Sequence, residues 1–161
     1  MSDPSATNVR VHVDEAEGLP LAERVDRSAV AALACHVLTA EGIDRAEVSL
    51  VFCGDEHISG LNREWLDHEG PTDVIAFGLD EEGADGDGTE GEVYIDLAQA
   101  VRQAPEYGVT VDEEVCRLVV HGILHLLGYD DLEEGARTRM DARQEELVAG
   151  WSQPLLSEAP R

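Results

Sequence analysis

The run from Val115 to Leu127 constrains the fold more than any other stretch, because it is apolar on nearly every side of a helix. Besides two histidines, its only polar side chains are Cys116 and Arg117. A helix of this composition is buried, so the run predicts a central helix against which the rest of the chain packs. Gly128 directly follows the run, and a glycine in this place predicts the end of the helix.

The two histidines of this run are the first candidates for chemistry. His121 and His125 stand four residues apart, so both imidazoles project from one face of the predicted helix. A single histidine in an apolar segment is usually a core residue with a satisfied hydrogen bond. Two at this spacing favour a metal site, because burying both without partners is costly and one ion would bind both.

A third ligand is available directly after the turn at Gly128. Asp130 and Asp131 both bring carboxylate oxygens back toward the histidine side. Two helical histidines and one carboxylate make three protein ligands with an open fourth position, which is the arrangement of a catalytic zinc site. The spacing alone leaves Asp130 and Asp131 as alternatives.

The length and the patterning predict one α+β domain. The chain has 161 residues, which is typical of a single domain. We expect about four strands in a mixed sheet, covered by about five helices, with the metal site on the buried helix. The domain is predicted to span residues 9–150, with flexible tails at 1–8 and 152–161.

The expected elements follow from periodicity and from helix start signals. Strands are predicted at Val9–Asp14, Ala46–Phe52, Pro71–Phe77 and Gly91–Asp96. A long helix should begin at Pro20 and end near Gly42, and a short one should be capped by Asp55, with Ile58, Leu61 and Trp65 on its inner face. Capping boxes at Asp96–Gln99, Thr110–Glu113 and Asp131–Glu134 predict the starts of three more helices, the last running toward Gly150.

The charge is strongly acidic. There are 35 acidic residues against 11 arginines and no lysine, for a net charge of −24. Such a field repels polyanions at low salt. We interpret the acidity as a surface adapted to concentrated salt, where screening confines the repulsion to a few Å. Any contact with nucleic acid would then depend on a local group of arginines.

The remaining composition points to the cytoplasm. Cys35, Cys53 and Cys116 are scattered and odd in number, which predicts free thiols in a reducing compartment. No apolar run is long enough to cross a membrane, and the first residues lack the pattern of a signal peptide.

The histidine motif resembles the signature of the YbeY family, the bacterial metal-dependent endoribonucleases also described as rRNA maturation factors. The motif runs from His121 to Asp130, and further family-like blocks precede and follow it. These are Leu61-Asn62-x-x-Trp65, Pro71-Thr72-Asp73-Val74-Ile75-x-Phe77, Gly91-Glu92-Val93-Tyr94-Ile95, and then Met140 with Gln144-Glu145. The resemblance covers about residues 46–148.

The resemblance implies the site residues, with two departures. The family motif ends in a third metal-binding histidine, and here Asp131 takes that position, which favours Asp131 over Asp130. A carboxylate is a good zinc ligand, but its charge should raise the pKa of a metal-bound water. The family also has an arginine, tied to RNA handling, where this chain has Leu66; Arg63 is the candidate replacement for substrate binding.

The function implied is zinc-dependent cleavage of single-stranded RNA. One Zn²⁺ would be held by His121, His125 and Asp131, in a cytoplasmic protein acting in rRNA maturation and ribosome quality control, with the small ribosomal subunit as a candidate partner. One alternative is a non-catalytic assembly factor with a structural zinc. The other is a zinc peptidase, which is disfavoured because Gly122 stands where such enzymes carry a glutamate base.

Overall fold

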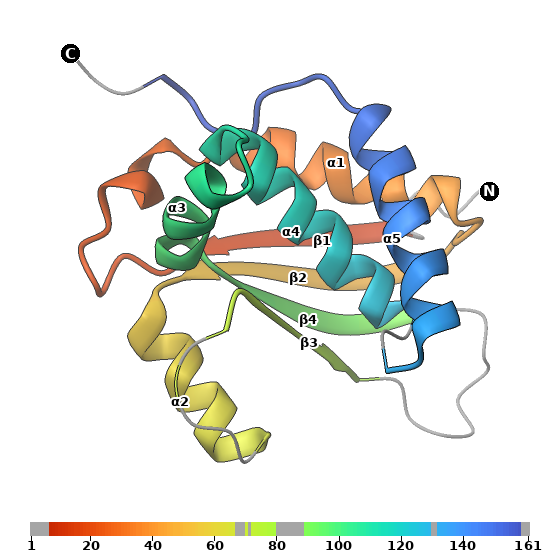
Figure 1. Cartoon of the computed structure of the whole chain (residues 1–161), viewed down its shortest axis with the longest axis horizontal. Coiled ribbons are helices and arrows are strands. Elements are labelled where there is room, and N and C mark those ends of the chain that lie inside the picture. The colour runs from red at the N-terminus through yellow and green to blue at the C-terminus, as the bar shows by residue number, and fades with distance from the viewer. Residues whose placement is uncertain (1–6, 67–69, 71, 80–88, 130–131, 159–161) are drawn as a thin grey trace.

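The computed structural model describes residues 7–66, 70, 72–79, 89–129 and 132–158. In these residues, four strands form one mixed sheet in the order β1-β2-β4-β3 (Figure 1). They are β1 (Thr7–Val13), β2 (Ala46–Cys53), β3 (Val74–Gly78) and β4 (Thr89–Asp96). β1, β2 and β4 run parallel, and β3 pairs with β4 in the antiparallel sense.

Within the described ranges, five α-helices and one 3₁₀ turn pack around the sheet. They are η1 (Pro20–Arg24), α1 (Arg27–Ala40), α2 (Asp55–Trp65), α3 (Leu97–Glu106), α4 (Val111–Leu126) and α5 (Glu134–Ala149). The predicted α+β class, with four strands and five helices, is therefore confirmed.

The two faces of the sheet carry separate apolar clusters. Along β4, Val93 and Ile95 belong to the main core with α1 and α4, whereas Tyr94 belongs to a smaller cluster under α2. Successive strand residues point to opposite faces, so α4 and α2 cover opposite faces of the sheet. In Figure 1, α4 crosses the strands and α5 lies beside it.

The helix α4 is the central buried element that the sequence predicted. Thr110 caps it by accepting a hydrogen bond from the backbone N–H of Glu113 at 3.1 Å. Its residues Val115, Val119, Val120, Ile123 and Leu124 are fully buried. The helix ends at Leu126, and Gly128 follows with φ of 101°, a left-handed conformation that favours glycine.

Two of the predicted helix starts, at Pro20 and at Asp131, are wrong. Pro20 opens only the 3₁₀ turn η1, and α1 begins after Asp26, whose side chain caps it at Ala29 N. Val25, between them, is extended and bridges Leu156. The last helix starts at Glu134 after the N-cap Glu133, later than the predicted box at Asp131 allows.

The start of α2 is also different from the prediction. Asp55 is its first residue, not its cap, because the N-cap is Gly54. The carboxylate of Glu17 accepts hydrogen bonds from the backbone N–H groups of Glu56 and His57 instead. Trp65, expected on the inner face, is 65 % exposed. A cap supplied from 39 residues upstream has no local sequence signal.

Parts of both predicted tails are ordered. Residues 7 and 8 belong to β1. Leu155 is fully buried, and the carboxylate of Asp112 accepts hydrogen bonds from the backbone N–H groups of Leu155 and Leu156. The predicted flexible tail from residue 152 is therefore wrong in this segment, which closes the core beside the N-terminus of α4.

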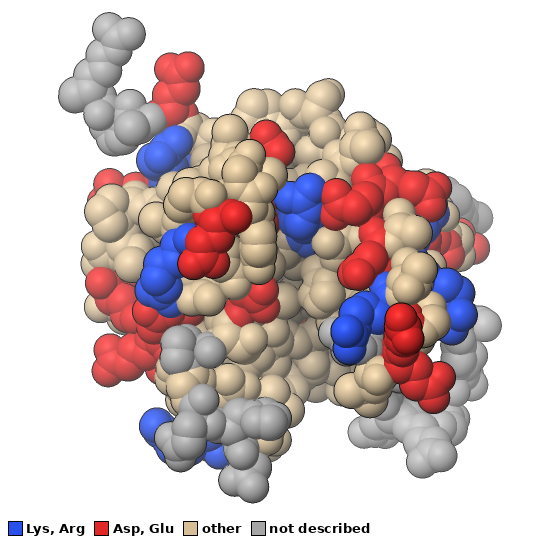
Figure 2. Space-filling model, in the orientation of Figure 1, with Lys and Arg blue, Asp and Glu red and all other residues tan. Residues whose placement is uncertain are grey.

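Arginines on the surface lie among acidic side chains. Figure 2 shows blue groups next to red ones, not gathered in one patch on this face. Arg102, Arg117 and Arg143 each bind a carboxylate, of Asp55, Glu145 and Glu41 respectively. Among the described residues, no helix is both long and apolar enough to cross a membrane.

Candidate metal centre

His121 and His125 lie side by side on α4, as their spacing predicted. Their ring centroids are 4.7 Å apart and the ring planes are inclined by 76°. Both residues are half-buried, so the imidazoles remain within reach of solvent and of a ligand. The prediction that both project from one face of a buried helix is confirmed.

Gln144 of α5 selects the tautomer of one imidazole. Its Oε1 lies 2.7 Å from Nδ1 of His121, and an amide oxygen can only accept a hydrogen bond. Nδ1 of the neutral ring therefore carries the proton, which leaves Nε2 with a free lone pair. Metal-binding histidines commonly donate their other N–H to such a partner.

The Gln144 amide is itself held from the other side. Its Nε2 donates a hydrogen bond to Oε2 of Glu145 at 3.3 Å. Arg117 of α4 donates to both oxygens of the same carboxylate, from Nε at 2.9 Å and from Nη2 at 2.8 Å. The Arg117 guanidinium holds the pKa of Glu145 below its usual range. The chain of contacts thus runs from α4 to α5 and back to His121.

Gly122, the residue after the first histidine, faces the sheet. A Cβ placed on it would collide with Val93 Cγ1 and would lie 2.9 Å from Val74 Cγ2. The glutamate base that peptidases carry at this position would have no space here. The tertiary structure therefore gives a steric reason for the glycine that the sequence showed.

The predicted third ligand, Asp131, and its alternative, Asp130, lie outside the described residues. Within the ranges that the structure describes, no three His, Cys, Asp or Glu side chains are grouped so as to hold a metal ion. The histidine pair fits a metal, because His121 keeps the tautomer that binding at Nε2 requires. A carboxylate in the segment after Gly128 stays the predicted third ligand.

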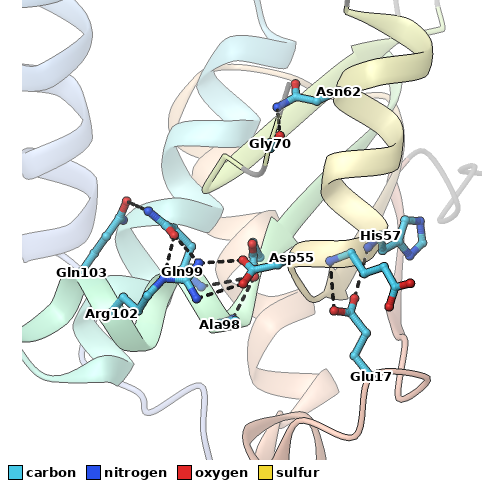
Figure 3. Close-up of polar contacts among 11 residues, drawn as sticks. Glu17, Asp55, His57, Asn62, Gly70, Ala98, Gln99, Arg102 and Gln103 are labelled. Atoms are coloured by element: carbon cyan, nitrogen blue, oxygen red, sulfur yellow. Dashed lines mark hydrogen bonds and ion pairs between the residues drawn. The ribbon is translucent and has the colours of Figure 1, made fainter. Parts of the chain in front are cut away.

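A second polar cluster, which the sequence did not predict as such, joins α2 to α3 (Figure 3). Arg102 binds both carboxylate oxygens of Asp55, at 2.6 and 2.9 Å, and this hydrogen bonding lowers the pKa of Asp55 to about 2. Asp96 is fully buried and caps α3 by accepting from Ala98 N and Gln99 N. Burial, followed by the neighbouring Asp55, raises the pKa of Asp96 to about 7.

Comparison with known proteins agrees with this fold and motif. The family model described as Endoribonuclease YbeY matches residues 14–152. A protein of that name from Thermobifida fusca is 37% identical over 155 residues, covering 92% of this chain and 97% of its own. One from Pelotomaculum thermopropionicum is 46% identical over 118 residues, covering 70% and 78%.

This chain belongs to the YbeY family. The solution structure of TM1509 from Thermotoga maritima is similar to it, with a TM-score of 0.56 and 25% identity over 87% of this chain and 86% of that one. The resemblance to the YbeY family that the sequence suggested is thus confirmed, and the fold is similar to that of a solved structure.

One of the two departures from the YbeY pattern, Asp131, lies outside the described residues, and the other, Leu66, lies at the end of α2. Leu66, in place of the family arginine, ends α2 and is 42 % exposed. Arg63 lies exposed in the last turn of the same helix. The structure therefore places Arg63 and the histidines on helices that cover opposite faces of the sheet, and its predicted role in substrate binding stays a prediction.

Proposed function

We propose that this protein is a zinc-dependent endoribonuclease that cleaves single-stranded RNA. The observation that carries the proposal is the hydrogen bond from His121 Nδ1 to Gln144, which leaves Nε2 ready to bind a cation beside His125. Membership of the YbeY family and the names of its relatives support the choice of RNA as the substrate.

His121, His125 and Asp131 would hold one Zn²⁺. When bound, the ion would supply Lewis acidity for activating a water molecule or polarising a phosphoryl oxygen. The chain itself keeps His121 in one tautomer through Gln144 and keeps both rings accessible from solvent. Attack by water and attack by the RNA's own 2′-OH both agree with this arrangement.

The substrate would be RNA of the ribosome, in the cytoplasm, as the family resemblance implies. We propose a role in rRNA maturation and ribosome quality control, in contact with the small subunit. Arg63 would contact the RNA backbone in place of the arginine that Leu66 replaces. If so, Arg63→Met should weaken RNA binding, and Leu66→Arg should strengthen it.

The peptidase alternative is disfavoured by the packing of Gly122 against Val93 and Val74. No side chain at position 122 could act as a base without displacing the sheet residues beneath it. The structural-zinc alternative predicts that the fold depends on the metal, so that the chelated protein would be unfolded.

Comparison of His121→Ala with His12→Ala tests the proposal. His12 is an exposed residue of β1, so its loss controls for the removal of an imidazole. We expect His121→Ala to lose bound zinc and RNA cleavage, while His12→Ala keeps both. Unchanged zinc content and unchanged cleavage in purified His121→Ala would contradict the proposal.

A further inference from the structure

A chain of hydrogen bonds runs from His121 through Gln144 to Glu145 and Arg117, and each group in it acts as donor or acceptor in one sense. His121 Nδ1 lies 2.7 Å from Gln144 Oε1, and Gln144 Nε2 lies 3.3 Å from Glu145 Oε2. Arg117 closes the chain by binding both oxygens of Glu145. Because Glu145 is ionised, it can only accept a hydrogen bond, so the amide must turn its NH₂ toward it.

This orientation has a consequence for the histidine. A Gln144 amide flipped about its axis would set its oxygen against the Glu145 carboxylate and its NH₂ against His121 Nδ1. Two acceptors would then face each other in a partly buried place, which is costly. The ionised Glu145 thus selects one amide orientation, and that orientation selects the proton position on His121.

We propose that Arg117 and Glu145 form a positioning pair, which orients the Gln144 amide and thereby keeps His121 in the tautomer with its lone pair on Nε2. Among the contacts of the described residues, neither Arg117 nor Glu145 forms a hydrogen bond or ion pair with the imidazole. Their side chains are 25 % and 53 % exposed, and an ion pair with such access to solvent adds little stability. The pair therefore has its main effect through orientation.

The burial of Gln144 makes this control effective. Its side chain is only 8 % exposed, so water has little access to replace either hydrogen bond. Arg117 stands four residues before His121 on α4, and Glu145 directly follows Gln144 on α5. Helix α4 thus supplies Arg117 and His121, and α5 supplies Gln144 and Glu145, at one shared interface.

The positioning role rests on the proposed function in that it would serve zinc binding. The tautomer itself can be measured without metal. In the metal-free protein at about pH 8, where an unperturbed imidazole is neutral, ¹⁵N NMR of the ring nitrogens distinguishes the tautomers. We expect His121 to carry its proton on Nδ1 in the wild type. In Glu145→Ala it should become a mixture, and zinc affinity should fall about 10- to 100-fold, as for other groups that orient metal ligands.

Glu146→Ala is the matched control. Glu146 is the same residue type on the same helix, is 68 % exposed, and pairs only weakly with Arg143 at 3.8 Å. It has no hydrogen bond to Gln144 among the contacts of the described residues. The tautomer and zinc affinity should be those of the wild type in this variant.

The exchanged variant Arg117→Glu/Glu145→Arg separates positioning from simple stabilisation. It restores an ion pair between α4 and α5, but the group next to Gln144 can now only donate. The amide should reverse, present its NH₂ to His121, and move the proton to Nε2. If only the ion pair mattered, the exchange would restore the wild-type tautomer and zinc affinity.

The outcomes distinguish this inference from the proposed function. A wild-type tautomer in both Glu145→Ala and the exchanged variant would overturn the positioning role, whatever zinc does. Tautomer changes as expected, in a protein whose wild type binds no zinc, would support the positioning and overturn the proposed zinc enzyme.

Discussion

Asp96 and Asp55 form a carboxyl pair in which Asp96 is buried and Asp55 is held by Arg102. Figure 3 shows the contact between Asp55 and Arg102. Oδ2 of Asp96 has no N–H or hydroxyl donor among the described residues. Its neighbour is another carboxyl group, so a hydrogen bond between them requires a proton on one of the two. Arg102 keeps Asp55 ionised, and the proton therefore belongs to Asp96.

The pair predicts a pH-dependent stability. The pKa of Asp96 is raised from 3.8 to about 7, so between these values the folded state holds a proton that the unfolded state has lost. The free energy of unfolding should therefore fall as the pH rises from about 4 to about 7, and the contribution should then stay constant. The lowered pKa of Asp55, about 2, acts with the opposite sign and only below about pH 4.

Asp96→Asn tests this, because the amide oxygen can still cap α3 and the titration is gone. Denaturant unfolding at about pH 4.5 and about pH 8 should show a smaller loss of stability in the variant than in the wild type. Glu114, which is also buried with a raised pKa, leaves some dependence in both. Equal losses in the two proteins would refute the assignment to Asp96.

Gly122→Ala should destabilise the protein by about 1–3 kcal/mol, the usual effect of overpacking a core. The added methyl would meet Val93 Cγ1 and Val74 Cγ2, which belong to the adjacent strands β4 and β3. Gly60→Ala is the control, because it lies in α2 with nothing within 4 Å of its Cβ position. It should gain about 0.5–1 kcal/mol from helix propensity. Thermal or denaturant unfolding measures both, and a neutral Gly122→Ala would show that the sheet yields.

Asp131→Ala should weaken zinc binding strongly, whereas Asp130→Ala should leave it close to the wild type. The reason is that Asp131 takes the position of the third family histidine, as the motif implies. Competition with a chelator gives the two affinities. The reverse result would assign the ligand to Asp130, and no effect from either substitution would remove both from the site.

Removal of zinc should leave the protein folded. The helix α4 is anchored by Val115, Val119, Ile123 and Leu124, which are fully buried without help from a metal. The chelated protein should keep its helical circular dichroism and cooperative unfolding, with a fall in Tm that reflects only the lost binding free energy. A chelated protein that is unfolded at room temperature would favour a structural zinc.

The sequence was sufficient for features that depend on neighbours along the chain. The apolar run predicted α4, the i,i+4 spacing placed His121 and His125 on one face, and Thr110 predicted the start of the helix. Each of these follows from helix geometry within a few residues. The histidine motif also indicated the YbeY family.

Only the tertiary structure decided which distant groups meet. Glu17 caps α2 from a loop after β1, Asp112 holds the segment at Leu155, and Gln144 fixes the proton on His121. These contacts join residues far apart in the chain, so no local pattern encodes them. Their positions depend on how helices pack on the two faces of the sheet, which sets both the tautomer of the histidine and the steric need for Gly122.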